Sequence, residues 1–257
     1  MDVTWLQVLL LFSAALGAGL VDAIAGGGGL ITLPALLAVG LPPHFALGTN
    51  KGQSVFGSST ALFRFWRGGL VDGKRAKVTF PLGLLGAVAG TSLVLRLRPE
   101  TLRPVVLVLL VAVATFLLFR RPMPRPHEVA PPSHPRARAV AALLALGIGA
   151  YDGFFGPGTG TFLIVGFVAL LGDSLSRASA EAKVVNFASN LAAVTLFAGR
   201  GDVLWKLALP MAAGQMVGGF VGAHLAVRRG DRVVRPVMLL VVAGLVLKLG
   251  RDILVSR

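Results

Sequence analysis

Apolar residues gather into long runs that alternate with short polar segments along most of the chain. A helix needs about 20 apolar residues to span the hydrocarbon core of a bilayer, and several runs approach that length with few charges. The predicted spans are Trp5–Ile24, Ala46–Trp66, Val78–Leu95, Leu102–Phe119, Ala139–Phe155, Ser179–Phe197, Val203–Val227 and Val233–Lys248. The pattern therefore predicts an all-α, polytopic integral membrane protein.

Two of the apolar stretches are interrupted by glycines that closely follow an aspartate. Residues 22–36 read DAIAGGGGLITLPAL, and residues 152–164 read DGFFGPGTGTFLI. In a bilayer, unpaired backbone groups are costly unless they line a cavity or are covered by protein. The apolar piece after the first break, Leu30–Val39, is too short to cross as a helix. We expect it to be a half-helix or the return arm of a re-entrant hairpin.

The two breaks occupy matching places in the two halves of the chain. Asp22 and Asp152 are 130 residues apart, and Lys51 and Lys183 are 132 residues apart. Such a repeated spacing predicts an internal duplication. Two glycine pairs also recur at the offset of 132 and would let helix backbones approach closely: Gly86 with Gly90, and Gly218 with Gly222.

A stretch rich in proline and arginine separates the two halves. We expect an N-terminal transmembrane repeat at 1–119, a linker at 120–138 and a C-terminal transmembrane repeat at 139–257. Each repeat would hold one glycine-broken or re-entrant segment and three spans. The linker composition is typical of a solvated connection and not of a folded domain.

Basic residues outnumber acidic residues by 25 to 11, which gives a formal charge of +14. Most of the basic residues lie between apolar runs, where they orient a membrane protein, so nucleic acid is not expected as a partner. Loop arginines and lysines predict that the linker and the segment 64–77 are cytoplasmic in an inner (plasma) membrane. The side of the termini depends on whether the breaks are re-entrant. The sequence leaves a homo-oligomer open.

The residue types that support cofactor or catalytic chemistry are scarce. Cysteine is absent, and the four histidines are scattered. Disulfides and thiolate metal sites are therefore excluded, and no metal or cofactor is expected. A phosphate-binding loop with its closing lysine is absent, as is the motif of a hydrolase nucleophile. No catalytic residue is assigned, and an enzyme is not expected.

The candidate site combines the two breaks with the polar segments that follow them. Broken helices at corresponding places in two repeats indicate a transporter's binding site, because half-helix N-termini present free N–H groups near mid-membrane. Glycines let a small anion approach the backbone, and lysines with amides can hold it by charge-assisted hydrogen bonds. The candidate substrate-binding residues are Gly27, Gly28, Gly29, Thr49, Asn50, Lys51, Gln53, Ser54, Gly158, Thr159, Lys183, Asn186 and Asn190.

Each group of candidates also has another interpretation. The glycines could serve helix packing alone, and Lys51 and Lys183 could extend to a membrane surface. Asp22 and Asp152 could exchange protons, form ion pairs with the two lysines or cap the broken helix ends. Ion pairing or capping is favoured over proton exchange, because no second carboxylate or histidine lies nearby in the sequence to relay protons.

At these residues the chain resembles the TauE/SafE family of sulfite exporters and related anion permeases. The resemblance covers nearly the whole chain apart from the linker. Its carriers are Asp22 to Leu30 with Pro34, Gly48 to Lys51, Gly69 to Asp72, Gly156 to Gly160, Lys183 to Asn190 and Gly201 to Trp205.

The resemblance implies an integral inner-membrane protein that moves small sulfur-containing anions, such as sulfite or organosulfonates, without ATP. The chain departs from the family pattern at Ala182, which precedes Lys183, and at Pro157, which enters the second glycine run. We therefore do not expect the two half-sites to act alike. The alternative is a membrane scaffold or assembly subunit that transports nothing, and a water-accessible cavity between the breaks would distinguish the two.

Overall fold

A computed structural model describes residues 4–119 and 134–233, and all of its regular elements in these ranges are helices. They are α1 (Trp5–Ala25), α2 (Gly29–Ala38), α3 (Pro43–Arg67), α4 (Gly73–Val94), α5 (Pro99–Phe119), α6 (His134–Phe154), α7 (Thr159–Leu171), α8 (Leu175–Gly199) and α9 (Trp205–Arg229). The predicted all-α class is confirmed. Most of the linker 120–138 and the last predicted span, Val233–Lys248, lie outside the described residues.

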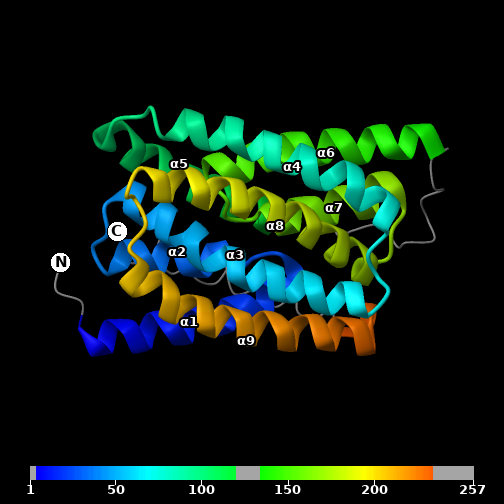
Figure 1. The fold of residues 1–257 in the computed structure, drawn as a ribbon, viewed down its shortest axis with the longest axis horizontal. Coiled ribbons are helices and arrows are strands. Elements are labelled where there is room, and N and C mark those ends of the chain that lie inside the picture. The colour runs from blue at the N-terminus through cyan, green and yellow to red at the C-terminus, as the bar shows by residue number, and fades with distance from the viewer. Residues whose placement is uncertain (1–3, 120–133, 234–257) are drawn as a thin grey trace.

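The helices form one elongated bundle (Figure 1). Helices α1, α4, α5, α6 and α8 are long and apolar enough to cross a membrane. Helices α3 and α9 have 25 residues each, which corresponds to about 37 Å at 1.5 Å per residue. These lengths fit a polytopic membrane protein.

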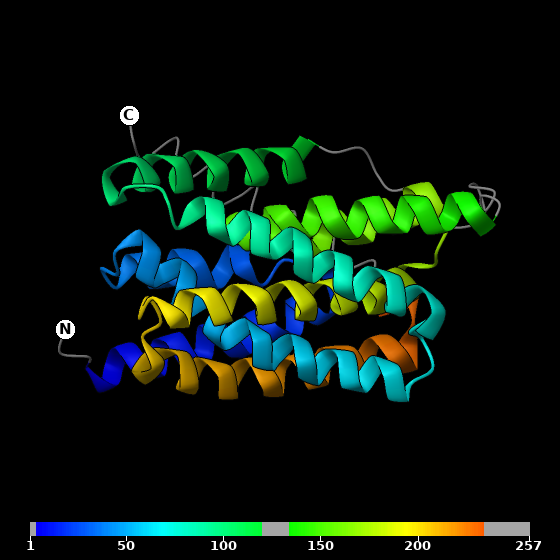
Figure 2. The same ribbon diagram turned by 45° about the horizontal axis from the view of Figure 1, so that its top comes forward.

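Both short helices turn back inside the bundle. In Figures 1 and 2, α2 returns toward the end where α1 begins, and α7 returns toward the end where α6 begins. The turns depend on glycine: Gly26 ends α1 with φ 77°, and Gly156 and Gly158 precede α7 with φ 99° and 84°. Other residues rarely adopt these angles. Of the two forms expected for Leu30–Val39, the structure has the return arm of a re-entrant hairpin.

The described helices occur in the same order in the two halves but run in opposite directions. Helix α1 heads toward the end of the bundle from which α6 starts, and α2, α3 and α4 are likewise opposed to α7, α8 and α9 (Figure 1). Such an arrangement is what three crossings per half would produce. The duplication itself stays a prediction.

Helix pairs from different halves pack with almost no space between their backbones. Helix α1 lies along α9, and α6 lies along α4. A Cβ atom added at Gly218 or Gly222 would collide with the backbone of α1, and one added at Gly86 or Gly90 would collide with the backbone of α6. The predicted close approach at both glycine pairs is confirmed, and it matches the small-residue interfaces of membrane helices.

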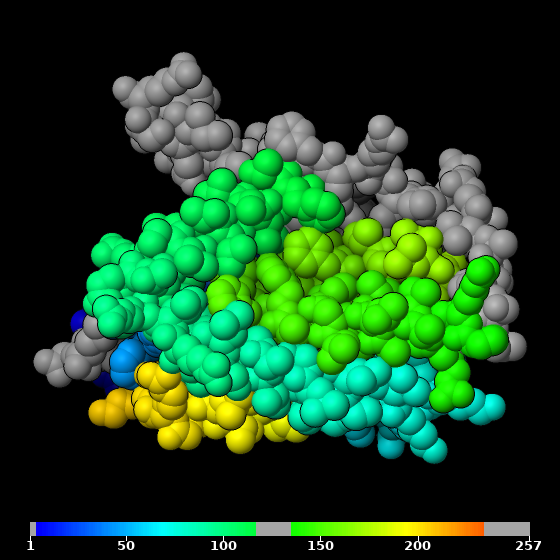
Figure 3. Space-filling model, turned by 90° about the horizontal axis from the view of Figure 1, so that it is seen from above, coloured from blue at the N-terminus to red at the C-terminus, as the bar shows by residue number. Residues whose placement is uncertain are grey.

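Large apolar side chains cover the outer face formed by α4, α5 and α6 (Figure 3). Leu85, Leu107, Val108 and Leu143 are all more than half exposed. Helix α8, in contrast, is mostly buried and lies beside α3 at the centre. The polar residues of α3 and α8 are therefore shielded from the lipid-facing surface.

Two glycines of α6 separate tight packing from helix propensity. A Cβ at Gly149 would lie 2.6 Å from the carbonyl oxygen of Gly83, whereas a Cβ at Gly147 would meet nothing within 4 Å. We expect Gly149→Ala to destabilise the protein by about 1–3 kcal/mol, because α4 and α6 must move apart. Thermal unfolding in detergent measures the effect. Gly147→Ala, two residues away, is the matched control and should be neutral or stabilising; equal losses would contradict the packing argument.

Candidate functional site

Two buried ion pairs cross between the halves of the chain. Lys51 Nζ on α3 donates to Asp152 Oδ1 on α6 at 2.7 Å, and Lys183 Nζ on α8 donates to Asp22 Oδ2 on α1 at 2.7 Å. The lysines are only 2% and 0% exposed. The structure thus has the ion pairs expected among the roles of the aspartates, and neither lysine extends to a membrane surface.

The starts of α3 and α8 set the depth of the lysines. Helix α3 begins at Pro43, a residue suited to the first helical position, and α8 begins at Leu175 after Ser174, whose hydroxyl caps the N–H of Arg177. Each lysine lies eight residues beyond the first residue of its helix, which is about 12 Å along the axis. This depth brings both ammonium groups to the broken helices.

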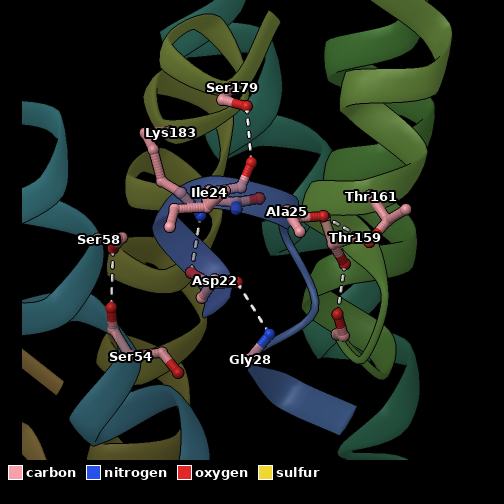
Figure 4. Close-up of polar contacts among 12 residues, drawn as sticks. Asp22, Ile24, Ala25, Gly28, Ser54, Ser58, Thr159, Thr161, Ser179 and Lys183 are labelled. Atoms are coloured by element: carbon pink, nitrogen blue, oxygen red, sulfur yellow. Dashed lines mark hydrogen bonds and ion pairs between the residues drawn. The ribbon is translucent and has the colours of Figure 1, made fainter. Parts of the chain in front are cut away.

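Asp22 also caps the first break. Its Oδ1 accepts a hydrogen bond from the N–H of Gly28 at 3.2 Å while Oδ2 faces Lys183 (Figure 4). A Cβ at Gly28 would lie 2.6 Å from the Cβ of Asp22. Glycine is therefore required where the chain turns past the carboxylate, and pairing and capping, which were separate alternatives, occur together.

Asp152 is held by side chains instead of backbone. The Thr159 hydroxyl lies 3.0 Å from its Oδ1, and the Ser189 hydroxyl contacts its Oδ2. Lys51 Nζ would lie 2.8 Å from a Cβ at Gly156, so the second break leaves room for the ammonium group. The departure from glycine at Thr159 thus supplies a hydroxyl that the first break lacks.

The two breaks contact each other directly. The Thr161 N–H donates to the carbonyl oxygen of Gly26 at 3.2 Å, and the Thr161 hydroxyl donates to that of Ala25 at 2.8 Å. Ser179 of α8 donates to the carbonyl oxygen of Ile24 at 2.9 Å (Figure 4). These bonds satisfy carbonyl groups that the end of α1 leaves without helical partners. Reasoning from the sequence missed both hydroxyl residues.

A cavity of about 30 Å³ lies between the breaks. Its lining includes the two predicted carboxylates, Asp22 and Asp152, and the predicted binding residues Gly29, Asn50, Lys51, Ser54, Thr159, Asn186 and Asn190. It also includes Gly26, Gly156, Gly160 and Gln215, which the sequence did not suggest. A volume of this size is about one water molecule's share of liquid water, so the site is closed in this state.

The remaining predicted residues lie behind this lining. Thr49 accepts the N–H of Leu204 at 3.0 Å, and the Gln53 amide donates to Asn50 Oδ1 at 3.1 Å and to Ser54 at 3.0 Å. Lys183 reaches the cavity only through Asp22. Gly27, Gly28 and Gly158 shape the turns but do not line the cavity. The predicted set therefore divides into lining residues and residues that support them.

Some buried polar atoms of the site have no partner among the described residues. They are Gln53 Oε1, Asn186 Oδ1 and Gln215 Oε1. Asn186 and Gln215 line the cavity. Because a buried polar atom without a partner is costly, these amides are available to a polar ligand or to water.

Glu181 of α8 is a fully buried carboxyl that sequence reasoning overlooked. Its Oε1 accepts the N–H of Asp72 at 2.6 Å. Glu181 lies 132 residues after Thr49, and Leu204 lies 132 after Asp72, so this bond is the counterpart of the one between Thr49 and Leu204. The spacing used for the lysines could have found it. The residue ties α8 to the loop before α4.

Charged residues surround this loop at the end of the bundle. Arg75 pairs with Asp173, and Arg177 pairs with Asp72 and Asp173. Burial works against ionisation of Asp72, but the N–H groups of Arg75 and Lys74 and the Arg177 charge hold its pKa below its ordinary value. The end of the bundle near Thr49 is held in a different way, by a neutral hydrogen bond.

Comparison with known proteins places the chain among membrane transporters. A family model described as "Sulfite exporter TauE/SafE" matches residues 11–249. A "Probable membrane transporter protein ORF9" of Sinorhizobium sp is 38% identical over 98% of this chain and 95% of its own. The "Probable membrane transporter protein YfcA" of Escherichia coli strain K12 is 37% identical over 94% of this chain and 89% of its own. A "Probable membrane transporter protein" of Haemophilus influenzae is 37% identical over 93% of both chains. No solved structure matches.

Removing one partner of a crossed ion pair should be far worse than removing both. We expect Lys183→Met to destabilise the protein by about 3–5 kcal/mol, since Asp22 would keep a buried charge without its partner. The double variant Lys183→Met with Asp22→Asn should recover most of that loss. Thermal unfolding in detergent measures both.

The matched control is Arg177→Met, because Arg177 forms ion pairs with a half-exposed side chain. Exposed pairs contribute about 0–1 kcal/mol, so this variant should unfold close to the wild type. A double variant no more stable than Lys183→Met alone would contradict the electrostatic explanation.

Proposed function

The chain belongs to the sulfite exporter TauE/SafE family and is a membrane transporter, and from this premise we propose that it carries a small sulfur-containing anion, such as sulfite or an organosulfonate, between its two broken helices. Members of the family are transporters and not enzymes. The names of the relatives say only that they are probable membrane transporters, so the substrate class is our inference.

The observation that carries the proposal is the cavity lined by both breaks and by the ammonium group of Lys51. Gly29 is the first residue of α2, and Gly160 is the second residue of α7. The first N–H groups of a helix have no partner within the helix and favour anions. Two such helix starts, a lysine and the amides of Asn186 and Asn190 provide donors on several sides of a small oxyanion.

A non-transporting scaffold is the weaker alternative. Such a protein has no use for partnerless amides and broken helices around a shared cavity, since ionisable and polar groups at membrane depth are costly. The closed cavity means that the breaks must separate before an anion enters. Opening toward one side of the membrane at a time would be the transport step.

The proposal includes an orientation and surroundings. The chain would lie in the inner (plasma) membrane, with its apolar outer face against lipid and with the linker 120–138 in the cytoplasm. Arginines and lysines of the loop between α3 and α4 and of the linker support this side by the positive-inside rule. The re-entrant breaks agree with three crossings in each half.

Lys51 should be essential for transport. We expect Lys51→Ala to lower sulfite exchange in proteoliposomes by at least about 100-fold, the scale of a lost buried charged hydrogen bond. The measurement is exchange of labelled anion at equal pH on both sides, extended to sulfate, thiosulfate and organosulfonates to define the substrate.

The matched control is Lys206→Ala, which removes an exposed lysine from the start of α9 and should keep wild-type exchange. Size-exclusion profiles distinguish loss of binding from loss of folding. Wild-type exchange by correctly folded Lys51→Ala would refute the assigned role, and absence of exchange of every anion by the wild type would refute the proposed substrate class.

A further inference from the structure

The cavity is electrically neutral when its ionisable groups carry their ordinary charges. Lys51 is balanced by Asp152, and Lys183 is balanced by Asp22. Adding an anion alone would leave one uncompensated negative charge in a region of low dielectric constant, which is strongly unfavourable. An anion that binds here must therefore bring a positive charge with it.

The hydrogen bonds around Asp152 have room for one more proton. The Thr159 hydroxyl contacts both Asp152 Oδ1 and the Gly156 carbonyl oxygen, at 3.0 and 2.6 Å. The Ser189 hydroxyl contacts both Asp152 Oδ2 and the Asn186 carbonyl oxygen, the latter at 3.1 Å. Two hydroxyl protons thus face four acceptor contacts. A proton on Asp152 fills one of the two contacts left without hydrogen.

Asp22 lacks this capacity. Its partners are the Lys183 ammonium group and the Gly28 N–H, which can only donate, whereas hydroxyl groups can donate or accept. Donors alone hold a carboxyl in its ionised form. Lys183 also does not line the cavity, but Lys51 does. The pair that can open toward a ligand is therefore Lys51 with Asp152.

Few other charges face Asp152. Lys51 comes from α3, and the pair of Asp22 on α1 with Lys183 on α8 lies around the same cavity. Helix α7 contributes Thr159, and α4 meets this part of α6 with Gly90 and Thr91. Protonation of Asp152 is therefore governed mainly by Lys51 and by whatever replaces Asp152 beside it.

We propose that Asp152 takes up one proton for each monoanion that binds at Lys51, so that the transported unit is a monoanion together with a proton. The inference rests on the proposed function and extends it to the substrate's charge and to its coupling ion. A dianion would need a second proton, for which the cavity has no equivalent acceptor among its described residues.

The exchange balances in atoms and charge. A proton from water joins Asp152 Oδ2, and the ion pair with Lys51 opens. The neutral acid donates to the Ser189 oxygen, and Ser189 turns its own proton to the Asn186 carbonyl group. The Lys51 ammonium then donates to the anion. Site charge is zero before and after, and release reverses each step.

The test uses the full-length protein in proteoliposomes with labelled methanesulfonate, a strong acid that stays a monoanion across the working pH range, and with sulfite in parallel. We expect wild-type protein to exchange label at equal pH and to accumulate it when the opposite side is more acidic. Asp152→Asn mimics the neutral acid, so it should keep exchange but lose accumulation driven by the pH gradient.

Asp22→Asn is the matched control, because it changes the symmetry-related carboxylate. It should keep the response to the pH gradient in whatever exchange it retains. Accumulation by Asp152→Asn, or loss of the pH response only in Asp22→Asn, overturns the assignment to Asp152. Wild-type exchange without any response to the gradient overturns proton coupling, whereas no wild-type exchange of either anion overturns the proposed function instead.

A binding measurement keeps the inference testable if Asp152→Asn does not fold. Adding methanesulfonate to wild-type protein in weakly buffered detergent solution should take up one proton for each anion bound. Methanesulfonate affinity should fall about tenfold for each unit of pH above the range in which Asp152 is protonated. Binding without proton uptake at every pH overturns the inference.

Discussion

The structure depends on keeping four charges paired where water is scarce. A lysine in the interior of a membrane protein is stable only beside a counter-charge, and each counter-charge here comes from the opposite half of the chain. Neither half can bury its own lysine correctly without the other. The crossed pairs thus select the arrangement of the halves and at the same time place both breaks around one cavity.

Much of the fold could be predicted from the sequence because membrane helices are written in runs of apolar residues. Glycine after aspartate predicted both breaks, and the return of α2 was one of two expected forms. The partners of the lysines could not be predicted, since pairing of Lys51 with Asp152 and not Asp22 is decided by packing between distant segments. The binding role of these residues stays a prediction. Ser189, Gln215 and Glu181 were overlooked because a single polar residue in an apolar helix has no local signature.

The two halves share a layout but not a chemistry. Thr49 and Glu181 hold equivalent loops, one through a neutral hydroxyl and one through a carboxyl within a cluster of arginines and aspartates. Charged clusters near a surface respond to salt, and neutral hydrogen bonds respond far less. The ends of the bundle therefore differ in how ionic strength affects them, although the helices that form them correspond.

The glycine contacts between α1 and α9 and between α4 and α6 have a mechanical consequence. Backbones packed without intervening side chains resist sliding, so each pair behaves as one rigid body, and each body contains a helix from both halves. The first break belongs to the body of α1 and α9, and the second belongs to the body of α4 and α6. A hinge between these bodies, and not between the sequence repeats, would separate Gly26 from Gly160 and open the space between them.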